Sequence, residues 1–197
     1  MSPIVSTLAG VAARGYGGLG ASVGVAFAPS GAYDSIASAS GTGASDTITF
    51  SSIPATYTHL QIRYIGNASG SDRLFMRFNG DTASSYNAHN VIGDGSGTGT
   101  NYQATSSISW AGYFMDTTVS ATAMGVGVID ILDYTNTNKY KTTRTLTGWD
   151  NNGSGYVALA SGLWRNTNAI TSITLIPQNN PNWTTNTRFA LYGIKGA

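Results

Sequence analysis

Apolar and polar residues alternate in short runs over most of the chain beyond residue 45. In residues 59–65 (HLQIRYI), Leu60, Ile62 and Tyr64 share one side of an extended chain, and polar side chains occupy the other. Residues 73–78 (RLFMRF) repeat this arrangement, and a period of two is typical of a half-buried strand. Further strands are predicted at residues 47–53, 106–115, 124–132, 139–149 and 156–164, and twice within 170–194.

The spacing of these runs predicts how the strands are arranged. About nine short strands separated by turn-forming residues are typical of an antiparallel β-sandwich. We therefore predict an all-β fold, an antiparallel β-sandwich, with a jelly roll as the preferred arrangement. Residues 59–65 and 73–78 are expected to form a hairpin, residues 126–131 a strand near the centre of the sandwich, and residues 79–105 one long loop.

Composition supports this fold and argues against several classes of partner. Hydrophobic residues make up 41% of the 197 residues and charged residues 10%, against about 25% charged in an average soluble chain. A net charge of +1 with scattered Lys and Arg argues against nucleic acid as a partner. No apolar run reaches the roughly 18 residues of a membrane helix, so we expect no membrane insertion. Without Cys, the chain has neither disulfides nor thiolate metal sites.

The first 31 residues differ from the rest of the chain. They contain seven Gly, one Arg and no acidic residue, with apolar side chains spread among them. A flexible but apolar segment is typical of an arm that becomes ordered against another protein. We predict an extended N-terminal docking arm at 1–31, a linker at 32–45 and a β-sandwich domain at 46–197. The residues expected to form the docking interface are Ile4, Val5, Leu8, Val11, Arg14, Tyr16, Leu19 and Phe27.

Groups able to carry out catalysis are sparse. Asp130 and Asp133 are the one close pair of carboxylates in the sequence, and a glycosidase needs such a pair with one raised pKa. Asp133 begins a polar turn, where Asp commonly has a structural role. His59 and His89 are thirty residues apart, with no other His or Cys at metal-ligand spacing. We therefore expect no catalytic residue, no metal and no cofactor, and predict that the protein is not an enzyme.

A glycine-rich stretch at 93–101 lies within the predicted long loop. Its Asp94-Gly-Ser-Gly-Thr-Gly segment has one carboxylate and lacks the closing Glu of a calcium loop. Neither a helix nor a Lys follows to complete a phosphate cradle. A flexible glycine loop is the interpretation we adopt, and its role stays open.

Aromatic residues give a more specific indication of a ligand. Exposed rings near strand ends and loops can stack on the faces of sugars or fill a subunit interface, although most Trp residues in a domain of this size belong to the core. Tyr102, Trp110 and Trp183 are the candidates for glycan stacking. The wider set near predicted strand ends and loops also includes Tyr113, Trp149 and Trp164.

Three segments of the chain resemble structural proteins of tailed phages. The start STLAGVAARGYGGLG, with its Ala-Arg-Gly-Tyr-Gly motif at 13–17, resembles the short amino-terminal segments of phage fibre and other minor virion proteins. Residues 51–66 (SSIPATYTHLQIRYIG) and 161–197 are similar to the body of phage structural modules, which commonly finish in a strand of Leu-Tyr-Gly-Ile type. The resemblance implies a virion component, a homotrimer whose arm docks on tail, baseplate or capsid proteins and whose β-domain projects outward.

Four functions follow as hypotheses. The first is a non-enzymatic virion structural protein of short tail fibre type, which serves host attachment. The second is a capsid decoration or cement protein that stabilises the head, and the third is a module that binds host surface glycan through the rings of Tyr102, Trp110 or Trp183. The fourth, a polysaccharide depolymerase, would require Asp130 and Asp133 as its acid pair.

Overall fold

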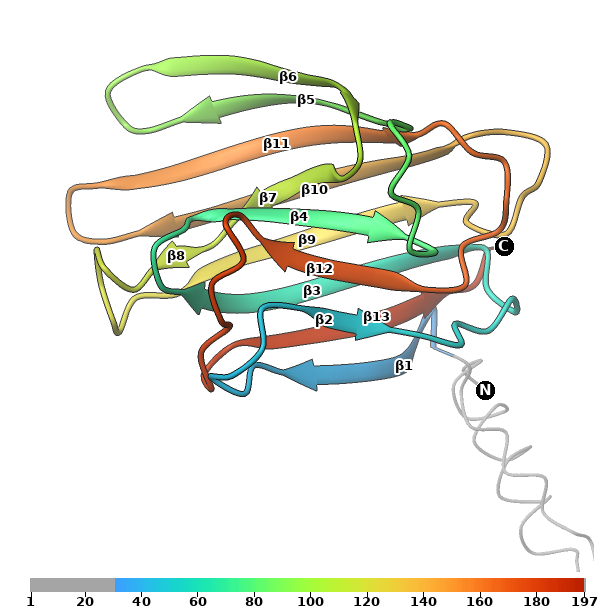
Figure 1. The fold of residues 1–197 in the computed structure, drawn as a ribbon, viewed down its shortest axis with the longest axis horizontal. Helices are drawn as coiled ribbons and strands as arrows, with labels where there is room; N and C mark the ends of the chain where they lie inside the picture. The colour runs from blue at the N-terminus through green and yellow to red at the C-terminus, as the bar shows by residue number, and fades with distance from the viewer. Residues whose placement is uncertain (1–30, 197) are drawn as a thin grey trace, which may run out of the picture. The chain divides into compact units, whose positions relative to one another are not determined.

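The computed structural model of the chain describes residues 31–196, which form two β-sheets and no helix. The sheets lie face to face, eight strands in the path of the large one and four in the small one (Figure 1). The large sheet runs in the order β1 (Tyr33–Ser40), β13 (Arg188–Ile194), β3 (His59–Ala68), β9 (Gly125–Leu132), β10 (Lys141–Asp150), β11 (Gly155–Trp164), β5 (Tyr86–Gly93) and β6 (Thr98–Ser106), with β8 (Met115–Asp116) beside β3. The small sheet runs in the order β2 (Ile48–Phe50), β12 (Ile173–Pro177), β4 (Arg73–Phe78) and β7 (Ser109–Tyr113). Neighbouring strands are antiparallel except for the short β3–β8 pair, so the prediction of an all-β, antiparallel fold is confirmed.

The order of strands along the chain differs from their order in the sheets. Strands β1 to β4 alternate between the large and the small sheet, and β12 and β13 alternate again at the end. Two hairpins, β5–β6 and β10–β11, stay within the large sheet and widen it. As a result the large sheet extends beyond β7, the last strand of the small sheet, toward β5 and β6 (Figure 1).

The core lies between the sheets and is built from the alternation seen in the sequence. Leu60 and Ile62 of β3, and Leu74 and Met76 of β4, are fully buried. Complete burial of one such side chain stabilises the fold by about 1.5–3 kcal/mol. Aromatic rings fill the wider parts of this core, as where Trp164 packs on Phe78 with ring centroids 5.5 Å apart.

Tyr64 of β3 links the two sheets through its hydroxyl group. The hydroxyl donates to the main-chain oxygen of Tyr113 in β7 at 2.6 Å and shares a hydrogen bond of 2.6 Å with Thr147 of β10. Its ring crosses Gly127 of β9, where an added Cβ would lie 2.5 Å from a ring carbon. The absence of a side chain at Gly127 therefore makes room for this connection.

Two regions predicted to lack regular structure contain strands. The predicted linker at 32–45 includes β1, which pairs with β13 at the edge of the large sheet. The predicted loop at 79–105 contains β5 and most of β6. Both predictions were wrong because these strands carry many small or polar side chains and have little buried apolar surface to produce a clear alternation.

The predicted hairpin of residues 59–65 with 73–78 was also wrong. Both segments are strands, but β3 belongs to the large sheet and β4 to the small one. The turn between them includes Gly70 at φ +77, a conformation that glycine adopts at little cost. Alternation identifies the buried side of a strand but not its neighbour, so it cannot distinguish a hairpin from a crossing between sheets.

The predicted docking arm lies outside the described residues except for Gly31. All eight residues expected to form its interface fall in that part of the chain: Ile4, Val5, Leu8, Val11, Arg14, Tyr16, Leu19 and Phe27. Their role therefore stays a prediction.

Replacing Gly127 with Ala is expected to destabilise the sandwich by about 1–3 kcal/mol, because the new methyl group overlaps the ring of Tyr64. Gly99→Ala in β6 is the matched control, since a Cβ there meets nothing within 4 Å. Urea unfolding curves of the two variants measure the difference in the free energy of unfolding. Equal stability of both variants would contradict the close packing of Tyr64 on β9.

Candidate functional site

The two carboxylates considered for catalysis are held in separate polar contacts. Asp130 accepts hydrogen bonds from Gln61 at 2.8 Å and from Arg144 at 3.1 Å. Asp133 accepts from Lys139 and lies 3.3 Å from His59 Nδ1. The hydrogen bond from Lys139 outweighs partial desolvation and, with the charge of Lys139, holds the pKa of Asp133 below its usual range. A carboxyl group in this setting is ionised at neutral pH, which is the opposite of what a general acid requires.

The two histidines do not meet in space to form a metal site. His59 accepts a hydrogen bond from the main-chain N–H of Asp133 at 2.9 Å, and His89 stacks on Tyr102 with ring centroids 5.9 Å apart. Across residues 31–196, no group of three or more His, Cys, Asp or Glu side chains is placed to hold a metal ion.

Residues 94–97 of the glycine-rich stretch at 93–101 form the turn of the β5–β6 hairpin, and the rest of the stretch belongs to its two strands. One carboxylate oxygen of Asp94 accepts from the main-chain N–H groups of Ser96 at 2.9 Å and Gly97 at 2.8 Å. These hydrogen bonds lower the pKa of Asp94, and Gly95 adopts a φ of +85. The turn is therefore closed by its own carboxylate, and the interpretation of the whole stretch as a loop is corrected, because residues 98–101 belong to β6.

Lys141 is a fully buried cation without a carboxylate partner in the described structure. Its ammonium group donates to the main-chain oxygens of Asn136 at 2.6 Å, Lys139 at 3.1 Å and Thr167 at 2.9 Å. Burial lowers the pKa of Lys141, and the charge of Lys139 adds to this effect. Three carbonyl acceptors satisfy the three donors of the ammonium group, which indicates a structural role in joining two loops.

The most extensive unusual surface is an apolar patch on the outer side of the large sheet. Six branched side chains there are between 41% and 58% exposed, and Val128 lies among them, partly buried. Together the six offer on the order of 500 Å² of apolar surface, near the upper end of what monomeric proteins expose. We call this patch the aliphatic face; it consists of Ile65, Val91, Val126, Val128, Leu146, Val157 and Leu159.

The sheet register brings these residues together from five neighbouring strands. Leu146 of β10 lies opposite Val128 on one side and Leu159 on the other, and Leu159 lies opposite Val91 of β5. Because neighbouring strands are about 4.8 Å apart, the aliphatic face is about 20 Å wide. Between Val126 and Val157 the facing residue is Gly148, and a shallow hollow of about 500 Å³ lies there, next to Leu146.

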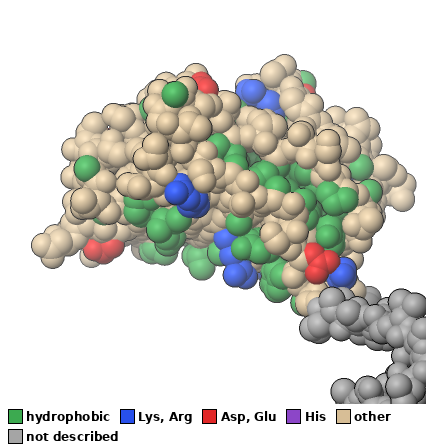
Figure 2. Space-filling model, turned by 90° about the horizontal axis from the view of Figure 1, so that it is seen from below, with side chains coloured by type: hydrophobic (Ala, Val, Ile, Leu, Met, Phe, Trp, Pro, Cys, Tyr) green, Lys and Arg blue, Asp and Glu red, His purple; other side chains and the backbone are tan. Residues whose placement is uncertain are grey.

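Charges of both signs lie beside the aliphatic face. Arg144 pairs with Asp130 at 3.1 Å, and the guanidinium of Arg63 lies over the rings of Tyr33 at 5.4 Å and Tyr192 at 5.5 Å. Seen from the side of β1 and β2, charged side chains are few and hydrophobic ones cover wide areas (Figure 2). A surface of this kind has no single-sign field to select a charged partner, so it is suited to another apolar surface.

The three rings predicted to stack on glycan differ in their exposure and in the part of the fold where they lie. Trp183 is 0% exposed and packs against Phe114 and Phe189 in the core. It therefore presents no ring face to a sugar, and we remove it from the candidates. Tyr102 is 72% exposed on the outer side of the large sheet. Trp110 is 7% exposed on β7, at the margin of the small sheet.

Comparisons with known proteins do not assign the chain to a family. The chain matches no family model, no curated protein and no solved structure. Residues 31–196 also contain no helix with the length and apolarity needed to cross a membrane.

The aliphatic face could have been found in part from the sequence. The outward residues Val126 and Val128 alternate with inward Ile129 and Ile131, which makes both sides of β9 apolar. We interpreted this as burial of both sides within the sandwich, whereas one side is exposed. Leu146, Val157 and Leu159 were missed because single apolar residues on an outer face carry no signal until the register places them side by side.

Proposed function

We propose that the protein is a non-enzymatic structural component of a tailed-phage particle, a short-fibre-type part that serves host attachment. The resemblance of residues 13–17, 51–66 and 161–197 to phage structural proteins supports this proposal. The main structural support is the aliphatic face, because an exposed apolar patch of this size is typical of a protein that works within an assembly. Its localisation in this proposal is the virion.

In this proposal the β-sandwich is a jelly roll with two inserted hairpins. Without β5–β6, β10–β11 and the short β8, the remaining strands form two sheets in the orders β1-β13-β3-β9 and β2-β12-β4-β7. The last strands, β12 and β13, return to lie between the first ones, as the two nested Greek keys of a jelly roll require. Jelly rolls occur in viral capsid and lectin domains, an analogy of fold alone.

The aliphatic face packs against neighbouring copies of the same chain in a homotrimer. At about 25 cal/mol per Å², burying it contributes roughly 10 kcal/mol per copy, comparable with the 4–15 kcal/mol or so that association costs. Polar contacts at its margin must therefore add to the binding, and Arg63, Arg144 and Asp130 lie there with both signs of charge. The net charge of +1 causes little repulsion between copies.

Light scattering after size-exclusion chromatography of the full chain tests this assembly. The expected mass is three times 20.4 kDa. Leu146→Asp should weaken association at least ~100-fold, because it places an unpaired charge inside the interface. Thr142→Asp is the control, since Thr142 is exposed on the same strand and the same side but outside the aliphatic face.

A single-copy mass at all concentrations would contradict the proposed assembly. Equal dissociation of the Leu146→Asp and Thr142→Asp variants would contradict the use of the aliphatic face.

The docking arm attaches the trimer to other virion proteins. Because the buried hydrophobic residues of the described part, 31–196, lie between Ile48 and Leu191, a chain shortened to residues 32–197 should keep its unfolding temperature within a few degrees. The same shortened chain should fail to join the particle, which imaging of particles reconstituted with each form measures. Normal incorporation of the shortened chain would contradict the role of the arm, and density on the head would favour the decoration hypothesis over the tail-fibre one.

A further inference from the structure

The large sheet has an uncovered region on its inner side, opposite the aliphatic face. The small sheet ends at β7, which lies over β10 and β11, while β5 and β6 continue beyond it. Tyr86 and Ala88 of β5 are buried under the small sheet, but Asn90 and Ile92, further along on the same side, are only partly buried. The β5–β6 hairpin therefore projects past its cover and presents a concave inner surface.

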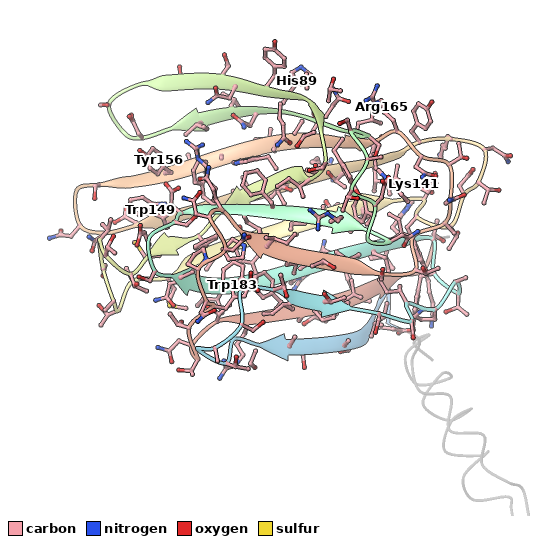
Figure 3. All side chains as sticks on the ribbon, viewed as in Figure 1. His89, Lys141, Trp149, Tyr156, Arg165 and Trp183 are labelled. Carbon is pink, nitrogen blue, oxygen red and sulfur yellow. The ribbon has the colours of Figure 1, made fainter. Side chains whose placement is uncertain are left out.

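Four aromatic rings form a continuous row beside this surface. Trp110 meets Tyr113 edge to face with ring centroids 5.2 Å apart, and Tyr113 stacks on Tyr156 of β11 at 5.3 Å with 17° between the planes. Tyr156 in turn meets Trp149 of β10 edge to face at 5.2 Å. Trp149 and Tyr156 lie together on the side of the β5–β6 and β10–β11 turns (Figure 3).

Two hollows adjoin this row of rings. One has a volume of about 220 Å³ and includes Trp110 and Tyr113 in its lining. The other, of about 480 Å³, includes Trp149 and Tyr156 and lies between the two turns. The stacked pair Tyr113–Tyr156 connects them, and we call the two hollows with the four rings the aromatic cleft.

The smaller hollow of the aromatic cleft is lined by three amide side chains. Asn90, Asn101 and Gln103 line the smaller hollow, and an amide group both donates and accepts hydrogen bonds. Gln103 uses its oxygen to accept from the main-chain N–H of Trp110 at 3.0 Å, which leaves its amide N–H groups for another partner. Arg73 is the charged residue of this lining, and its nearest approach to Asp72 is 3.9 Å.

Two buried polar atoms in this region have no hydrogen-bond partner among the described residues. One is an acceptor, Asn90 Oδ1, and the other a donor, Trp149 Nε1. Buried polar groups are rarely left without a partner, so each of these two atoms is available for a hydrogen bond with a ligand or with water. A hydroxyl group can act as donor to the first and as acceptor from the second.

We infer that the aromatic cleft binds a saccharide. A pyranose ring has an apolar face of C–H groups that matches an aromatic ring, and its hydroxyl groups match the amides of Asn90, Asn101 and Gln103. An aromatic surface with a few placed polar groups is the usual make-up of a small-ligand site. The carboxylates of the larger hollow are engaged in their own turns, Asp94 with Ser96 and Gly97 and Asp150 with Asn152, so the cleft suits binding of a sugar without its hydrolysis.

This inference is independent of the proposed assembly. The four rings lie on the side of the large sheet opposite to the aliphatic face, although Val157 of that face also lines the larger hollow. A monomeric protein would still carry the cleft. The inference places sugar recognition on Tyr156 and its neighbours, whereas Tyr102, which also lines the smaller hollow, stacks its ring on His89.

An immobilised array of defined neutral and uronic-acid-containing oligosaccharides, probed with the full chain, tests the inference. We expect binding to a subset of the array, and titration calorimetry with the best-bound oligosaccharide gives the affinity. Tyr156→Ala and Asn101→Ala should each weaken it about tenfold, through loss of ring stacking and of a hydrogen bond respectively. Asn101 is exposed on β6, so its variant tests the cleft even if Tyr156→Ala fails to fold.

Thr100→Ala is the matched control, because Thr100 is exposed on the outer side of the same hairpin, opposite Val91, and lines neither hollow. It should leave the affinity unchanged. Loss of binding in Thr100→Ala but not in Asn101→Ala would overturn the placement of the site. Absence of binding to every oligosaccharide on the array would overturn the inference itself, whatever the mass of the assembly.

Discussion

The unequal width of the two sheets determines the inner surface to which we assign a role. A four-stranded sheet can cover only part of an eight-stranded one, and the uncovered inner side must meet water or another molecule. Next to β7 this inner side carries the rings of Trp110, Tyr113, Tyr156 and Trp149, which cover one another instead of a second sheet. Exposure of apolar groups to water costs free energy. The four rings therefore pack against one another where no second sheet buries them.

Small side chains allow the two sheets to approach closely where they do overlap. Below β7, the inward residues of β11 include Ala158, Ala160 and Gly162. A Cβ at Gly162 would lie 2.5 Å from Thr143 and 2.8 Å from Ser109 of β7. β10 contributes inward threonines there, and Thr147 donates to the main-chain oxygen of Tyr113 at 2.7 Å. Hydrogen bonds of this kind need short distances, so the small residues of β11 and the polar contacts of β10 depend on each other.

The sequence predicted strands well where one side is buried and poorly where neither side is. Strands β3, β4, β9 and β11 were placed within a few residues because apolar or small side chains recur at every second position, and β10 because it is flanked by polar turns and carries β-branched threonines. In β6, most residues are exposed, and in β1 small residues occupy both sides of the strand, so neither strand shows apolar–polar alternation. Alternation reports burial, and these two strands are held mainly by main-chain hydrogen bonds to one neighbour, which any side chain permits.

The candidate surfaces depend on register, which the sequence did not provide. Trp183 and Trp149 both follow polar turns or strand ends in the sequence, yet Trp183 is enclosed in the core and Trp149 lines a hollow. The two rings differ in burial because Trp183 lies where the small sheet covers the large one, whereas Trp149 lies where that cover ends. Likewise, Tyr156 had no special feature in the sequence, and it joins the row of rings because it lies opposite Trp149 in the β10–β11 pair and below Tyr113.

In our two proposals, the outer side of the large sheet serves assembly and the inner side serves recognition. If outer sides meet in a trimer, the inner sides and their clefts stay available on three separate copies. Single saccharide sites of this size bind weakly, but three clefts on one assembly can engage a repeating surface glycan together, and such linkage raises the overall affinity by factors of 10² or more without any new contact. Burial of the aliphatic face and weak binding in each cleft would then reinforce each other, because the first supplies the multiplicity that the second requires.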